Sequence, residues 1–209
     1  MTSPKLQLAR AFDALRKDLL SEDGPRISTM RNYRFAIVPY APEHEFELRD
    51  HVQRTIGTLS AGGWVVKTVS LHALLLQRIR GLGEGIVKRM IEAERGAAKV
   101  APERGINYLR TKLGAQLDGP DGIAADVARE ITTFADAYPE MAERMVVFVG
   151  RAGALYPFFR VSSLLKHLDG RTRNVPVVLL YPGERRGEAG LSFMGELAPD
   201  RDYRPRIYP

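Results

Sequence analysis

The 209-residue chain contains no cysteine, which excludes disulfide bonds, thiolate metal sites and a cysteine nucleophile. It has no apolar run near the roughly 20 residues of a membrane-spanning helix, and its first residues lack the apolar core of a signal peptide. The absence of cysteine also fits a reducing compartment. We therefore expect a cytoplasmic protein that makes no contact with a membrane.

Motifs for phosphate and dinucleotide binding are missing as well. A Walker loop needs Gly-Lys followed by Ser or Thr, so that backbone amides and a lysine meet the phosphates, and Gly-Lys never occurs in this chain. The Gly-x-Gly-x-x-Gly dinucleotide signature is also absent. Gly150-Arg-Ala-Gly153 sits where a phosphate loop would lie, and its amides could hold an anion, or its glycines could simply form a tight turn.

No catalytic constellation emerges from the other residue types. The segment Gly190–Gly195 resembles a nucleophile elbow with Ser192 as the nucleophile, but it has one residue too many between the serine and the second glycine. His44-Glu45 matches the start of the His-Glu-x-x-His motif of zinc proteases. The second histidine should follow His44 by four residues, but Leu48 occupies that position. Nothing in the sequence brings two carboxylates into one cleft. We therefore expect a protein that is not an enzyme and that uses neither a metal nor a cofactor.

Apolar runs separated by helical stripes predict the fold class. Uninterrupted apolar runs with a helical crossover between them are typical of a parallel sheet that is covered on both faces. We therefore expect an α/β fold, a mostly parallel sheet covered by helices with P-loop-NTPase-like or Rossmann-like layering, in a single domain over residues 1–209. The expected strands are Tyr33–Pro39, Trp64–Ser70, Met145–Val149, Val175–Gly183 and a short Leu191–Met194.

Helical periodicity accounts for most of the remaining chain. Helices are expected at Lys5–Leu20, Glu43–Ser60 and from Leu155 to about Asp169, and the second of these joins two strands into a β-α-β unit. Residues 71–143 differ, because they carry several helical stripes and glycine or proline breakers but almost no β-branched runs. They are expected to form a helical insertion or a long crossover. Its helices are predicted at 71–80, 86–95, 106–117 and 123–138.

The carboxyl ends of the strands are where ligands usually bind in open parallel sheets. Tyr40, Arg151, Tyr181 and Arg185 come at or just after these ends, and we expect them to line any functional cleft. The net charge of +6 and the pI of about 9.7 suit contact with nucleic acid or an acidic partner, or a solvated surface that leans basic.

Four ordered motifs in the last third of the chain resemble the BrxB family of the bacteriophage exclusion (BREX) phage-defence systems. They are Met145–Phe158, Val175–Gly183, Leu191–Gly195 and Tyr203–Arg206. The preceding β-α-β unit is compatible with the resemblance in length and order.

The resemblance implies a small accessory protein that works beside a DNA methyltransferase, a large ATPase and a PglZ-type protein of the alkaline-phosphatase superfamily. It supplies no catalytic residues. It also implies a nucleotide-hydrolase-like sheet that lacks the phosphate loop, and a role in assembly that bridges the PglZ-type partner to other components.

Two functions from different classes follow. In the first, the protein is an adaptor whose helices and Arg- and Tyr-rich tail dock a defence partner, since Tyr and Arg suit interface anchors. In the second, basic loops bind the phosphates of DNA or RNA, with Arg171 and Arg173 among the contacts. An enzyme acting on a nucleotide or phosphoester at the strand ends is a third option. Besides the four residues at the strand ends, the residues expected to bind a partner or an anion are Arg186, Tyr203, Arg204 and Arg206.

Overall fold

The computed structural model of the protein describes residues 4–22, 24–27, 34–186, 190–196 and 205–208. Six strands form a sheet in the order β2-β3-β4-β1-β6, and β5 pairs with β4. All pairs are parallel except the antiparallel pair of β4 and β5. The strands are β1 (Phe35–Tyr40), β2 (Val65–Ser70), β3 (Met145–Gly150), β4 (Val177–Arg186), β5 (Gly190–Phe193) and β6 (Arg206–Ile207).

The expected β-α-β unit joins two strands that are not neighbours. β1 and β2 lie in the same parallel sheet, but β3 and β4 separate them. The burial of each strand agrees with its place. The central β3 is buried along five of its six residues, whereas β2 carries Lys67 and the exposed Thr68 at one edge. β6 is the other edge strand. The neighbouring Pro205 has no backbone N–H to donate to a second strand, which an edge strand tolerates.

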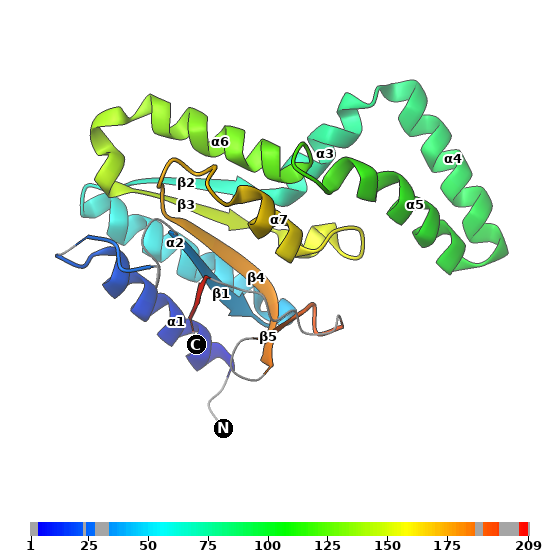
Figure 1. Ribbon diagram of the computed structural model, residues 1–209. Coiled ribbons are helices and arrows are strands. Elements are labelled where there is room, and N and C mark those ends of the chain that lie inside the picture. Colours follow the sequence, from blue (N-terminus) through cyan, green and yellow to red (C-terminus); the bar gives the residue numbers. More distant parts are fainter. Residues whose placement is uncertain (1–3, 23, 28–33, 187–189, 197–204, 209) are drawn as a thin grey trace.

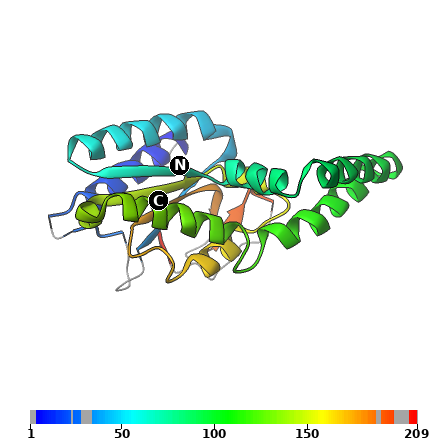
Figure 2. The same cartoon turned by 90° about the horizontal axis from the view of Figure 1, so that it is seen from above.

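Helices cover both faces of the sheet (Figures 1 and 2). α1 (Pro4–Leu19) and α2 (Glu45–Ala61) lie on one face, and α3 (Leu71–Gly81), α6 (Ile123–Ala137) and α7 (Val161–Leu168) contribute to the core on the other. Alternate strand residues point to opposite faces. Val38 and Leu180 pack with α1 and α2, whereas Ile37 and Leu179 belong to the core on the side of α3, α6 and α7, which we call the main core. The expected α/β class is confirmed.

The crossover after β3 differs from the prediction of one continuous helix from Leu155. A short 3-10 helix, η3 (Ala152–Leu155), follows β3, and α7 begins only at Val161. Tyr156 has extended backbone angles, φ −70° and ψ 138°. The residue before a proline is disfavoured in the α region, so Pro157 prevents the helix from starting where its apolar stripe begins.

The middle of the chain forms four α-helices, as predicted, but they do not all belong to the same layer. α3 and α6 pack towards the sheet, while α4 (Glu84–Val100) and α5 (Pro102–Leu117) pair with each other. In Figures 1 and 2 these two helices extend away from the sheet as an antiparallel hairpin. We refer to residues 84–117 as the α4–α5 hairpin. None of the residues of α4 is buried.

Candidate interaction site

The carboxyl edge of the sheet brings Tyr40 and Arg151 together through the carboxylate of Glu45. The Tyr40 hydroxyl donates to Glu45 Oε2 at 2.5 Å, and Arg151 Nη1 donates to Glu45 Oε1 at 3.1 Å. Arg49 Nε lies 3.6 Å from the same Oε1. Burial, reinforced by the hydrogen bond to Glu45, raises the pKa of Tyr40 well above its usual range. These groups satisfy one another, and they join the ends of β1 and β3 to the start of α2.

The turn after β3 is closely packed. The amide of Ala154 donates to the carbonyl of Arg151 at 3.2 Å, and that of Tyr156 to the carbonyl of Gly153 at 3.1 Å. A Cβ on Gly153 would lie 3.2 Å from the Met194 sulfur, so the segment after β5 covers this turn. Gly150–Gly153 therefore forms a tight turn under a neighbouring segment, and the carbonyls of Arg151 and Gly153 accept hydrogen bonds from the amides that follow. Anion binding by the amides of this turn stays a prediction.

Tyr181 lies in the core and does not line an open cleft, so its expected position is corrected. Its side chain is 0% exposed, its ring meets that of Phe193 edge-on at 5.5 Å, and its hydroxyl donates to the carbonyl of Leu191 at 3.4 Å. β4 continues beyond Tyr181 and pairs with β5, and these two paired strands cover the Tyr181 ring. Arg185 is exposed on the same extension of β4.

The C-terminal residues Arg206 and Tyr208 attach to α1. The Tyr208 hydroxyl donates to Asp18 Oδ2 at 2.8 Å, and Arg206 Nη2 lies 2.8 Å from the same oxygen. Arg206 also lies over the Tyr208 ring, 5.1 Å from its centroid. Both side chains therefore hold the edge strand β6 in place. Tyr203 and Arg204 lie outside the described residues, as does the side chain of Arg186.

The two loop arginines expected to meet phosphates also have partners within the chain. Arg171 Nη1 donates to the carbonyl of Pro120 at 2.8 Å, and Arg173 forms an ion pair with Asp136. Both contacts link the loop after α7 to α6 or to the segment before it.

The α4–α5 hairpin carries a different kind of surface. Its residues include seven Lys or Arg against four Glu, and none of the seven cations has an ion pair with another residue in the described part of the chain. Elsewhere, lysines and arginines of the helices and strands around the sheet do form such pairs. Four large apolar side chains are also exposed on the hairpin: Ile86, Ile91, Val100 and Ile106.

The two helices of the hairpin approach closely at Gly105. A Cβ on Gly105 would lie 2.9 Å from the Ala98 Cβ and 2.9 Å from Glu94 Oε1. At the sheet end, Met90 and Leu109 pack against the main core, and Leu113 and Leu117 belong to it. The base of the hairpin is therefore anchored by apolar contacts, while the outward face of α4 remains exposed.

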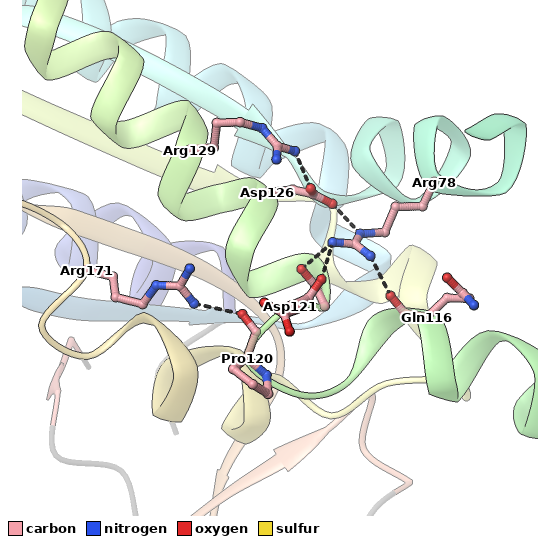
Figure 3. Close-up of polar contacts among 8 residues, drawn as sticks. Arg78, Gln116, Pro120, Asp121, Asp126, Arg129 and Arg171 are labelled. Atoms are coloured by element: carbon pink, nitrogen blue, oxygen red, sulfur yellow. Dashed lines mark hydrogen bonds and ion pairs between the residues drawn. The ribbon is translucent and has the colours of Figure 1, made fainter. Parts of the chain in front are cut away.

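A polar cluster around Arg78 fixes this base (Figure 3). Arg78, near the end of α3, forms an ion pair with Asp126 in the first turn of α6. Its guanidinium also donates to three carbonyl oxygens, one in the last turn of α5 and two in the segment between α5 and α6: Gln116 at 2.9 Å, Asp121 at 2.7 Å and Gly122 at 2.6 Å. The helix that enters the hairpin is thus tied to the segment that leaves it.

Ser163 of α7 also contacts this segment, since its hydroxyl donates to Asp118 Oδ1. That hydrogen bond, followed by the one from the Gly119 amide, lowers the pKa of Asp118. Neither the cluster nor the hairpin surface was predicted from the sequence. A signal for the cluster was present, because Asp126 interrupts the apolar stripe of α6 at a position that is only 6% exposed.

Within the described ranges, no helix meets the length and apolar character needed to cross a membrane. The same residues contain no group of three or more histidines and carboxylates placed to hold a metal ion.

A family model described as BREX protein BrxB matches residues 67–207. The matched region begins in β2 and reaches β6, and it contains the Arg78 cluster and the whole α4–α5 hairpin. Searches of curated proteins and of solved structures gave no match.

Proposed function

Because the chain belongs to the BrxB family and is therefore a component of a BREX phage-defence system, we propose that it is a non-catalytic assembly subunit. In this role it bridges a PglZ-type protein to other components of the system. The observation that carries the proposal is the α4–α5 hairpin, which extends from the sheet and combines exposed apolar side chains with cations that lack ion pairs within the described residues.

The carboxyl edge of the sheet supports a role other than catalysis. A parallel sheet usually binds its ligand there, but Tyr40, Glu45 and Arg151 bind one another at this edge. The Gly150–Gly153 turn lies against Met194. Tyr181, the other tyrosine expected there, is part of the core. Tyr40, Arg151 and Tyr181, three of the four residues that the sequence offered for ligand binding at the strand ends, therefore have structural roles.

Co-expression with the PglZ-type protein of the same defence system tests the proposal. Affinity purification of the full-length chain should retain the PglZ-type protein, and the two should elute together from a sizing column. A third component should join only when both are present, because a bridge has two contacts. Clean separation of the two proteins on the column would contradict the bridging role. A turnover of nucleotide or phosphoester by the purified chain would contradict the non-catalytic part.

Nucleic-acid binding is the second candidate, and the excess of cations on the hairpin is the observation that favours it. Neutralising several phosphates would make the affinity fall steeply as salt is added. Fluorescence anisotropy with a short DNA duplex and a single strand of RNA, at low and then rising salt, measures this directly. The adaptor proposal predicts that any such binding is weak at physiological salt and that duplex does not displace the PglZ-type protein.

A further inference from the structure

We propose that the outward face of α4 is the docking surface for an acidic protein partner, one that presents carboxylates around an apolar contact. The inference rests on the proposed function and deepens it, since it names the surface by which the assembly subunit holds the PglZ-type protein. Four residues define this face, which we call the outer strip: Arg89, Ala93, Gly96 and Val100.

Helical spacing places the outer strip on one side of α4. Its members follow each other at intervals of four, three and four residues, and such positions lie above one another on a helix surface. All four are exposed, and Val100 is 67% exposed. Helix α4 has 17 residues, which corresponds to a length of about 25 Å. The strip itself runs from Arg89 to Val100, which corresponds to about 17 Å of that length.

Gly96 makes the centre of the strip open to close approach. No heavy atom lies within 4 Å of the position that its Cβ would take. A glycine in an exposed helix interior lowers helix stability relative to alanine, and neither a positive φ nor a packed neighbour requires it here. With Ala93 one turn before it, Gly96 leaves a low surface between the larger Arg89 and Val100, on which a partner's backbone can lie.

The charge of the neighbouring positions decides the chemistry of the partner. Lys88, Arg95 and Lys99 are exposed beside the outer strip, with Glu92 among them. No cation of the hairpin is ion-paired within the described residues, whereas Arg78, Arg129 and Lys67 of the surrounding structure each face a carboxylate. Complementary charges steer association and fix its orientation. The partner is therefore expected to supply carboxylates.

The apolar side chains favour a protein over a nucleic acid. Val100 at the end of the strip is exposed, and so is Ile86, which lies three residues before Arg89 and therefore on a similar side of α4. Their burial is favourable against an apolar surface, but phosphates and sugars offer little such surface. A second copy of this chain is also disfavoured, because it would bring the same excess of positive charge to the contact and the whole chain carries a net charge of +6.

A pair of glycine substitutions tests the surface with a matched control. Gly96→Leu fills the low centre of the outer strip, while Gly57→Leu adds the same side chain to α2. Both glycines are exposed within 17-residue helices, and neither Cβ position has a heavy atom within 4 Å. Leucine has a better helix propensity than glycine, so both variants should fold. Thermal unfolding checks this before binding is measured.

Affinity for the co-expressed PglZ-type protein is then measured by biolayer interferometry. Gly96→Leu should weaken binding by at least about tenfold, as for a substitution at the centre of an interface, and Gly57→Leu should leave it unchanged. A charge-matched pair gives a second readout. Arg95→Glu/Lys99→Glu should slow association and reduce its salt dependence, whereas Arg10→Glu/Lys17→Glu, with the same change of charge on α1, should do neither.

The outcomes separate the two proposals. If the wild-type chain does not bind the PglZ-type protein, both the proposed function and the docking inference are wrong. Wild-type binding that is unaffected by both hairpin variants overturns the docking inference alone. The inference is also overturned if these variants reduce binding of a short DNA duplex but not of the PglZ-type protein, or if Gly96→Leu abolishes a concentration-dependent dimer of the wild-type chain.

Discussion

Arg78 and Asp126 form an ion pair across the base of the α4–α5 hairpin, although 48 positions separate them in the chain. Asp126 also pairs with Arg129, and Arg78 donates to three backbone carbonyls, one at the end of the hairpin and two in the segment that follows it. One guanidinium therefore satisfies a nearly buried carboxylate and orients a helical hairpin. We therefore expect this side chain to help set the direction in which the hairpin extends.

Replacing Arg78 should loosen the hairpin as well as destabilise the protein. Arg78→Ala leaves Asp126 with one cation and removes a donor from three carbonyl oxygens, of which that of Gly122 still accepts from the Ala125 amide at 3.0 Å. Removing one partner of a largely buried pair costs about 3–5 kcal/mol, and the remaining Arg129 should reduce the loss to about 2–4 kcal/mol. Urea unfolding measures this loss. Hydrogen exchange should become faster across residues 84–117 before the sheet is affected.

Arg80→Ala is the control for that experiment, because Arg80 is an exposed arginine in the same helix. Its effect should stay within about 0.5 kcal/mol, as for ordinary surface positions. Equal destabilisation by the two substitutions would mean that the Arg78 contacts contribute nothing beyond those of a surface residue.

The close approach of α4 and α5 predicts opposite effects for two glycine-to-alanine changes in one helix. At Gly105 the new methyl group would meet the Ala98 Cβ and Glu94 Oε1 at 2.9 Å, and such overpacking costs about 1–3 kcal/mol. At Gly114 the nearest heavy atom is a carbonyl oxygen at 4.0 Å, so Gly114→Ala should stabilise the helix by up to about 1 kcal/mol. Urea unfolding of the two variants gives the signs.

Adding Ala98→Gly to Gly105→Ala removes the methyl group opposite and should recover part of the lost stability. A double-mutant cycle isolates this coupling. If the two changes are simply additive, the two helices do not meet at this point as the structure has them.

The sequence predicted best those strands and helices that have a strong apolar period, whereas the helix expected from Leu155 begins only at Val161. The buried run at Met145–Val149 and the stripe of α6 are examples, and both elements begin where they were expected. The order of the strands was not predictable in this way. β1 and β2 flank one helix, yet β3 and β4 lie between them, and periodicity tells which face is buried without telling which strand is the neighbour.

The candidate site was harder to predict because burial and partners depend on tertiary contacts. Tyr181 ends an apolar run and was placed at a strand end, but the β4–β5 pairing continues past it and covers its ring. Arg206 was assigned to an Arg- and Tyr-rich tail that docks a partner, whereas the edge strand brings it to Asp18. The hairpin surface was missed for a related reason. Ile86, Ile91 and Ile106 look like core positions until the structure shows that they remain exposed.

The contact of Tyr208 with Asp18 predicts that the last residues contribute to stability. Tyr208 is 1% exposed, and burial, together with the hydrogen bond to Asp18, raises the pKa of its hydroxyl. Tyr208→Phe keeps the ring and removes this bond, which should cost about 0.5–1.5 kcal/mol. Tyr138→Phe, at a tyrosine that is 41% exposed, should change the unfolding free energy by less than about 0.5 kcal/mol. Chemical denaturation that ranks the two variants in the reverse order would contradict the docking of this tail.

His51 predicts how stability depends on pH near neutrality. Its ring stacks on Phe12 of α1 with centroids 5.4 Å apart, and burial, followed by the charges of Arg54 and Arg16, lowers its pKa. The unfolded chain therefore binds a proton more readily than the folded protein does. The resulting stability is fully present above the unfolded pKa of about 6.5, and it is lost as the pH falls through the lower folded value.

Urea unfolding at several pH values between about 7 and 5 measures this loss of stability. This pH range lies above the ordinary pKa values of Asp and Glu, which are near 4. The wild-type protein should lose stability on acidification, and His51→Gln should lose less, because it cannot take up the proton. The pKa values of the Glu47 and Asp118 carboxyls are lowered as well, so their protonation also reduces stability, but only at lower pH. Identical slopes for the two proteins would show that protonation of His51 does not oppose its packing between α1 and α2.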